Sequence, residues 1–190
     1  MSTPATIRFL NKRGEAFSGV YIHYDCDLGF LIDSILDASK HIIPFPIRCL
    51  GSDKRIRVRS ECASNLGCEE SDLKFAYGID KYAIAFTAAL YNRFDIYEDH
   101  KSQITVKIGG SEYKSKPEFY SGTEDFISQL DLNSNYKGNI VYLVDISFPN
   151  KSEFSLDYEP VIAITTGVGD TVFKGSLSKL KSESKNLLHP

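Results

Sequence analysis

Hydrophobic and polar residues alternate in two short runs near the start of the chain. The first run covers Ala5 to Asn11, where Ile7 and Phe9 share one side, and the second covers Val20 to Asp25. A polar stretch, Lys12 to Glu15, separates the two runs and has the composition of a turn. Because alternation is typical of a half-buried strand, the two runs predict a β-hairpin.

Helical spacing replaces the alternation after this hairpin. Apolar residues from Leu28 to Ile35 recur three and four positions apart, which predicts a helix that ends near His41. The alanine-rich stretch from Ile79 to Phe94 has the same spacing, with Asp80 as its expected N-cap. Between these segments, Asp53 to Gly67 fits either a helix or a short basic strand, and the helix is the favoured interpretation.

Strand patterns return in the second half of the chain. Ser102 to Lys116 predicts a hairpin around a glycine pair, and Thr123 to Leu130 predicts a short helix. Asn139 to Phe148 is almost continuously apolar and β-branched, so it predicts a central strand covered on both faces. Val161 to Phe173 predicts a last hairpin or a pair of short strands, with Gly167 to Asp170 as a turn.

The order of these elements predicts an α+β fold with a mostly antiparallel sheet and helices packed on one face. We expect one domain over residues 1–173, because the sequence contains neither an internal repeat nor a long linker. From Lys174 to Pro190 the chain is rich in Ser and Lys and has little periodicity. This composition predicts a flexible tail, with a short helical turn at its end as the alternative.

Composition narrows the classes of function. The chain has 190 residues, of which 42% are hydrophobic, enough for the core of one domain. Its formal net charge of −3 argues against nucleic-acid binding by bulk electrostatics, because such binding needs many cations to neutralise phosphates. No run is apolar enough to cross a membrane, and the first residues lack the pattern of a secretory signal. A cytoplasmic protein that makes no membrane contact is therefore expected, with cysteines as free thiols.

Four segments together resemble a protein family. They are MSTPATIRFLNKRGE at the start, VYIHYD in the second strand, KYAIAFTAAL in the alanine-rich helix and GNIVYLVDI in the late strand. In this order, over residues 1–148, they resemble a group of small proteins from bacteriophages and bacteria that has no established activity. Its members typically begin Met-(Ser/Ala)-Thr-Arg and carry a Tyr-x-His-x-Asp-Gly-Tyr segment, followed late in the chain by Gly-Asp-Ile-Glu-Tyr-x-Tyr.

This chain keeps part of the family pattern and departs from the rest. Tyr21, His23 and Asp25 match it, but Cys26-Asp27 stands where the family has Gly-Tyr, and Pro4 stands where it has Arg. The resemblance implies a phage or mobile-element origin. In that setting, small proteins that block host defences are common.

The segment His23-Tyr24-Asp25-Cys26-Asp27 concentrates groups that can perform chemistry. His23 and Asp25 share one face of a strand, because residues two apart point the same way. They are candidates for an oriented general base, with Asp27 as a third catalytic candidate. His23, Asp25 and Asp145 are also candidate ligands of a divalent metal. The structural alternative, which ranks first, is that Asp25 and Asp27 cap the helix that follows.

Cys26 is a weaker candidate within the same segment. Its place at a helix N-terminus lowers a thiol pKa and favours the nucleophilic thiolate. The carboxylates of Asp25 and Asp27 act in the opposite direction, because nearby negative charge raises that pKa. A catalytic cysteine therefore ranks below the metal site.

A dense basic run offers a second candidate site. Arg55, Arg57 and Arg59 lie in it and are candidates to bind a phosphate group or an acidic partner surface. An acidic run from Glu61 to Asp72 follows directly. The alternative, which ranks first, is a solvated face whose charges partly cancel.

Two classes of function follow. The first is a non-enzymatic interaction protein that binds a host or phage protein, or a small nucleotide, and antagonises a bacterial defence system. This class needs no cofactor. The second is a small hydrolase or nuclease that uses His23 and Asp25 around a divalent metal. The sequence leaves the partner, the host and the oligomeric state open.

Overall fold

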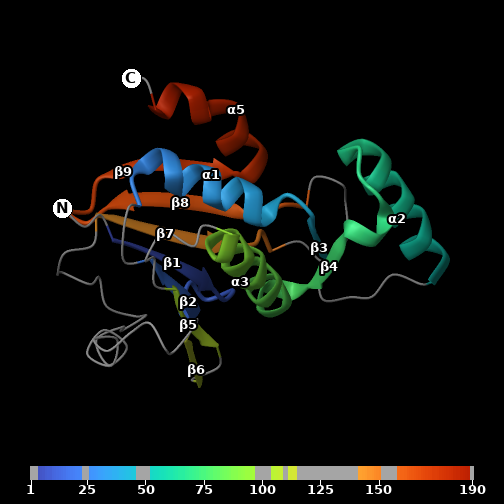
Figure 1. Cartoon of the computed structure of the whole chain (residues 1–190), viewed down its shortest axis with the longest axis horizontal. Coiled ribbons are helices and arrows are strands. Elements are labelled where there is room, and N and C mark those ends of the chain that lie inside the picture. Colours follow the sequence, from blue (N-terminus) through green and yellow to red (C-terminus); the bar gives the residue numbers. More distant parts are fainter. Residues whose placement is uncertain are drawn as a thin grey trace.

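A computed structural model describes residues 4–22, 26–45, 52–96, 104–108, 111–114, 141–150 and 158–188. Within these ranges one sheet has the strand order β6 (Ser111–Lys114), β5 (Ile104–Ile108), β2 (Ala16–Ile22), β1 (Ala5–Leu10), β7 (Tyr142–Ser147), β8 (Val161–Thr166) and β9 (Thr171–Ser176). In this sheet β1 and β7 run parallel, whereas the other neighbouring strands run antiparallel. The chain therefore has the predicted α+β fold with a mostly antiparallel sheet (Figure 1).

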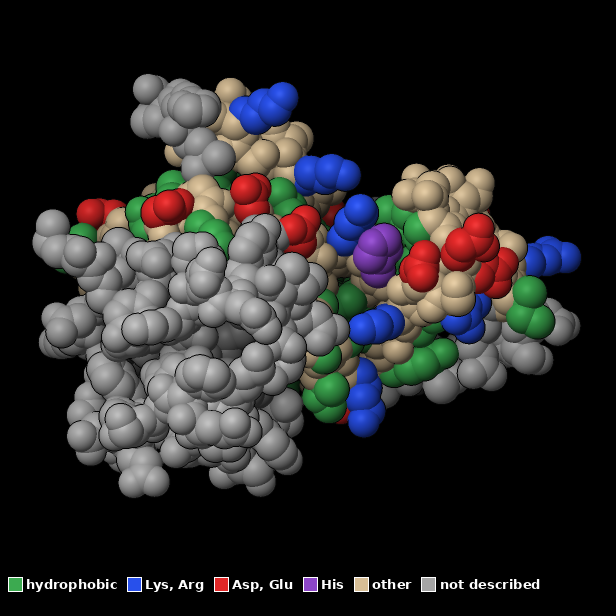
Figure 2. Space-filling model, in the orientation of Figure 1, with side chains coloured by type: hydrophobic (Ala, Val, Ile, Leu, Met, Phe, Trp, Pro, Cys, Tyr) green, Lys and Arg blue, Asp and Glu red, His purple; other side chains and the backbone are tan. Residues whose placement is uncertain are grey.

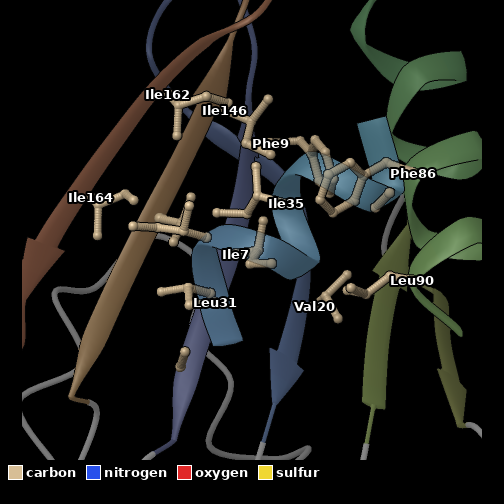
Figure 3. Packing of buried hydrophobic residues seen from close by; sticks show 14 of the residues in the cluster. Ile7, Phe9, Val20, Leu31, Ile35, Phe86, Leu90, Ile146, Ile162 and Ile164 are labelled. Carbon is tan, nitrogen blue, oxygen red and sulfur yellow. The ribbon is translucent and has the colours of Figure 1, made fainter. Parts of the chain in front are cut away.

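The hydrophobic core lies between this sheet and three helices: α1 (Leu28–Ser39), α3 (Gly78–Ile96) and α5 (Leu177–Leu188). Ile7 and Phe9 of β1 are fully buried on the same side of their strand. Figure 3 shows them pointing toward Ile35 of α1 and Phe86 of α3, and the rings of Phe9 and Phe86 meet edge to face at 5.5 Å. The alternating pattern of the first hairpin thus selects the face on which α1 and α3 pack.

A smaller unit extends beyond α3. It consists of the parallel strands β3 (Ile42–Phe45) and β4 (Lys74–Tyr77), joined through α2 (Ser52–Leu66) and the short 3₁₀ helix η1 (Glu70–Asp72). Figure 1 shows α2 lying apart from the large sheet, beyond β3 and β4. The segment from Asp53 to Gly67, which fitted either a helix or a short strand, is therefore a helix, and the favoured interpretation is confirmed.

Most expected elements in the described ranges are confirmed. The first hairpin, the hairpin of β5 and β6, the last hairpin and helices α1 and α3 all form. Helix α3 begins at Gly78, before Asp80, so Asp80 lies in its first turn and is not its N-cap. The short helix expected from Thr123 to Leu130 lies outside the described residues. No helix in the described part of the chain has the length and apolarity to cross a membrane.

The C-terminal segment differs from the expected flexible tail. Lys174 lies in β9, and the chain then forms helix α5. Leu180 on this helix is fully buried, and Leu177 and Leu187 pack against the same core. Leucines three and seven positions apart lie on one helix face, so this segment is anchored despite its many serines and lysines.

Strand β7 is covered less evenly than expected. Val144 and Ile146 are fully buried on the core side, whereas Leu143 and Asp145 on the other side are half-buried. The register pairs Asp145 with Arg8 of β1, which places two charged side chains on the opposite face. A charged pair keeps that face partly hydrated, because burying charges fully is costly.

Candidate binding site

Asp27, one of the predicted catalytic residues, caps helix α1. Its carboxylate accepts a hydrogen bond from the backbone N–H of Phe30 at 2.8 Å. This bond satisfies one of the free donors in the first turn, which is the structural alternative set out above for this residue. His23 and Asp25 lie outside the described residues.

Asp145, the third predicted metal ligand, is paired with Arg8. Its two carboxylate oxygens accept from Nε and Nη2 of the guanidinium at 2.7 and 2.8 Å. The two side chains are only 12% and 26% exposed. A bidentate pair of this kind uses one lone pair on each carboxylate oxygen and neutralises the charge that would attract a metal. In the ranges that the structure describes, no group of three His, Cys, Asp or Glu is arranged to hold a metal ion.

Cys26 is a core residue and not an exposed thiol. It is fully buried in the main hydrophobic cluster. Burial, assisted by the charge of Asp27, raises the pKa of its thiol to about 12. The thiol is therefore protonated at neutral pH, and a nucleophilic thiolate does not form.

The predicted basic site on α2 is engaged with its own chain at Arg59. The guanidinium lies 5.1 Å from the ring centre of Phe75 and donates to the carbonyl oxygen of Glu70 at 3.1 Å. Arg57 is exposed, and the side chain of Arg55 lies outside the described part. Figure 2 shows acidic and basic side chains side by side over α2 and η1. The described part of this surface therefore mixes positive and negative side chains, and it is not a purely basic patch.

A different site appears at one end of the large sheet. A pocket of about 340 Å³ opens where the parallel strands β1 and β7 reach their carboxyl ends, next to the first turn of α3. It is lined by Leu10, Asn11, Lys12, Arg13, Gly78, Ile79, Asp80, Phe148, Pro149 and Tyr158. Its volume lies near the lower end of the range of about 300–1,000 Å³ that small-molecule pockets span.

Asn11 fixes the basic turn at one side of this pocket. Its side-chain oxygen accepts from the backbone N–H groups of Arg13 at 2.8 Å and of Glu15 at 3.0 Å. Its side-chain nitrogen donates to the carboxylate of Glu15 at 2.9 Å. Gly14 completes the turn with a φ of 78°, which other residues rarely adopt. The turn that carries Lys12 and Arg13 is therefore held in one conformation.

The first turn of α3 forms a second side. Strand β4 passes into the helix at Gly78, whose φ of 79° allows this abrupt change of direction. Gly78 has no side chain, so the backbone at the start of the helix borders the pocket. Ile79 adds an apolar surface, and the exposed Asp80 contributes the one carboxylate among the described lining residues.

Aromatic rings form the third side. Phe148 follows β7 and stacks on Tyr158 with ring centres 5.4 Å apart and an interplanar angle of 15°. Behind them, the ring of Tyr82 meets Phe148 edge to face at 5.1 Å, and its hydroxyl donates to Ser39. Burial raises the pKa of Tyr158, so its hydroxyl keeps its proton at neutral pH. The pocket thus combines a rigid aromatic wall with two cations.

Sequence reasoning assigned Lys12 and Arg13 only to a turn, and it did not single out Phe148 or Tyr158 as site residues. The available signal was the pattern Asn11-Lys-Arg-Gly, in which Asn and Gly favour a tight turn with two adjacent cations. Nothing local connects that turn with Tyr158, which lies far away in the sequence.

Comparisons with protein-family models, with curated proteins and with solved structures found no match to this chain.

Proposed function

We propose that this chain is a non-catalytic binding protein whose ligand is an aromatic molecule of nucleoside size, held in the pocket beside the basic turn. The pocket itself carries this proposal. Its volume suits one small molecule, and its stacked Phe148 and Tyr158 offer a flat surface to an aromatic ring.

The composition of the pocket supports binding over catalysis. Among its described lining residues there is no His, Cys or Ser, and Asp80 is the one carboxylate. A nucleophile with an adjacent base, or a pair of carboxylates, is the usual minimum for acid-base or covalent catalysis. The lining instead has the mixture of apolar surface and a few polar groups that fixes a ligand in place.

The biological setting is a further part of the proposal. The family resemblance suggests a phage or mobile-element protein, and a binding protein that takes up a small nucleotide is one route to antagonising a bacterial defence system. The alternative hydrolase built on His23 and Asp25 stays a prediction. In the described structure, Asp27 and Asp145 are engaged by a helix cap and by Arg8.

Calorimetry on the wild-type protein tests the proposal. The probes are the four common ribonucleosides and their 5′-monophosphates, titrated one at a time. We expect saturable binding of at least one member and a rise in Tm at saturating ligand, because a ligand that binds only the folded state stabilises it. Absence of saturable binding by all eight compounds would overturn the proposal.

A fluorescent reporter then locates the binding. The chain contains no Trp, so Pro149→Trp places a single indole at the pocket. Val168→Trp provides the matched control, because Val168 is 87% exposed in the turn between β8 and β9. Emission that changes with ligand in the first variant only would support the pocket as the site. A change in the second variant alone would place the ligand elsewhere and contradict the proposal.

A further inference from the structure

We infer that the ligand of this pocket carries a phosphate monoester, and that Lys12, Arg13 and the start of α3 receive it. This inference rests on the proposed function and adds the charge and orientation of the ligand. The ligand class is then a nucleoside monophosphate, with its base against the aromatic wall and its phosphate at the basic turn.

The charges of the basic turn are available to a ligand. Lys12 and Arg13 both line the pocket, are exposed, and have no acidic partner among the described residues. Glu15 in the same turn is already held by the side chain of Asn11. The described lining residues therefore carry two positive charges and the single negative charge of Asp80. A dianionic group is favoured there, and an Arg guanidinium can bind phosphate oxygens with two parallel hydrogen bonds.

The rigidity of the turn strengthens this argument. Asn11 fixes the backbone of Arg13 and Glu15 before any ligand arrives, through the hydrogen bonds at 2.8 and 3.0 Å. A preformed site binds more tightly, because less conformational freedom is lost when the ligand enters. The cations therefore need only side-chain adjustment to meet a phosphate.

Helix α3 adds a favourable field at the same place. It spans Gly78–Ile96, long enough for its aligned peptide dipoles to create partial positive charge at its first turn. Because Gly78 lacks a side chain, a ligand can approach this backbone closely. The carboxylate of Asp80 lies in the same first turn and reduces this positive potential. Removing its charge should therefore strengthen the binding of a phosphate.

Tyr158 offers a hydroxyl group to a polar ligand in the same pocket. It is 7% exposed and lines the pocket, yet its hydroxyl has no hydrogen-bond partner among the described residues. A ligand oxygen in the pocket would provide one, since the protonated hydroxyl is a donor.

The test compares each nucleoside with its 5′-monophosphate on wild-type protein and on the double variant Lys12→Ala with Arg13→Ala. We expect the double variant to bind the monophosphate about tenfold more weakly, or worse, because it loses two charge-assisted contacts. Its affinity for the neutral nucleoside should stay within about twofold of wild type, because the aromatic wall is intact. The double variant Lys174→Ala with Lys181→Ala is the matched control, since both lysines are exposed and lie outside the pocket lining.

A second variant should change the affinity for the monophosphate in the opposite direction. Asp80→Asn removes the one described carboxylate of the lining, so it should bind the monophosphate several-fold more tightly and the nucleoside unchanged. Urea midpoints of all variants establish that each is folded at the temperature of the titrations.

The outcomes separate the two proposals. If nucleoside and monophosphate bind equally and neither responds to the charge variants, the phosphate inference is wrong while the aromatic binding function stands. If inorganic phosphate competes as well as the nucleotide, an isolated anion site replaces the nucleotide class. If no nucleoside or nucleotide binds the wild type, both proposals fail.

Discussion

The two hydrophobic regions of the molecule are built in different ways. The region under the large sheet contains 22 buried residues drawn from strands and helices across the described chain. Among the described residues, the smaller unit of β3, α2, η1 and β4 has three buried residues in its own cluster, Cys62, Ala63 and Leu73, while Ile42 of β3 and Ala76 of β4 are buried in the large core. Because burial of apolar surface dominates stability, the large core should set the global free energy of unfolding.

Polar contacts add to the few buried residues that hold the smaller unit together. Arg59 connects α2 to η1 and β4 through Glu70 and Phe75, and Ser60 also donates to the carboxylate of Glu70. Such exposed contacts stabilise only weakly. Helix α2 can therefore open locally while the core under the large sheet stays folded, since regions with few buried contacts open first.

The largest expected loss of stability comes from truncating a buried leucine, and the same truncation can be made in each region. Leu90 is 0% exposed in the large core and Leu73 is 3% exposed in the small cluster, so Leu90→Ala and Leu73→Ala remove the same atoms from similar burial. Buried Leu→Ala changes cost about 2–5 kcal/mol, and we expect Leu90→Ala near the upper end and Leu73→Ala near the lower end. Urea unfolding measures both. Equal losses would mean that the two regions form one cooperative core.

A second prediction concerns the pH dependence of the large core. The pKa of the Cys26 thiol is raised from its ordinary value of 9.0 to about 12, first by burial and then by the charge of Asp27. The folded state holds this proton more tightly, so its contribution is fully present below pH 9 and is lost as the pH rises toward 12.

From this shift we expect wild type to lose about 2 kcal/mol more stability than Cys26→Ala between pH 9 and pH 10.5. Urea unfolding at the two pH values measures the difference. Cys62→Ala, in the smaller unit, should change the pH dependence less, because the small cluster shields this thiol from water less completely than the large core shields Cys26. Parallel curves for wild type and Cys26→Ala would contradict the prediction.

The third prediction tests the charged pair on the opposite face of the large sheet. Asp145→Asn removes the charge that pairs with Arg8 in a half-buried place. We expect a loss of about 1–3 kcal/mol, the range for a hydrogen bond to a charged group. Asp170→Asn makes the same change at an exposed turn and should cost almost nothing. A similar loss in the two variants would show that the Arg8 pair has no special weight.

The smallest effect is expected in the smaller unit and should be local. Arg59→Ala removes the contacts with Glu70 and Phe75, and it should speed amide hydrogen exchange along α2 by an amount equivalent to about 0.5–1.5 kcal/mol. Protection of the large sheet should stay unchanged. Arg57→Ala, at an exposed position on the same helix, is the control. Faster exchange throughout the sheet would contradict the independence of the two regions.

The sequence predicted the hairpins and the main helices because each pattern there is local. Alternation in β1 and β2 and the spacing from Leu28 to Ile35 follow directly from strand and helix geometry. It predicted α5 poorly, because three leucines among many serines and lysines form a narrow apolar stripe. Only the large core shows that this stripe is enough to hold the helix.

The candidate sites were predicted less well, for a related reason. Asp27 was recognised as a helix cap, since a cap depends on residues three positions away. The pairing of Asp145 with Arg8 spans 137 positions and was not foreseen. The pocket also combines a turn, a helix start and two aromatic residues from four separate places in the chain.

The sequence by itself therefore determined the hairpins of the large sheet, helices α1 and α3 with their amphipathic faces, and the α+β class, because these depend on contacts between near neighbours. The tertiary structure alone decided that β1 lies beside β7 and that the basic turn faces Phe148 and Tyr158 across one pocket. The physical reason is that strand pairing joins distant segments through backbone hydrogen bonds, which any sequence of suitable pattern can form. Which strands meet is settled only when the whole core packs.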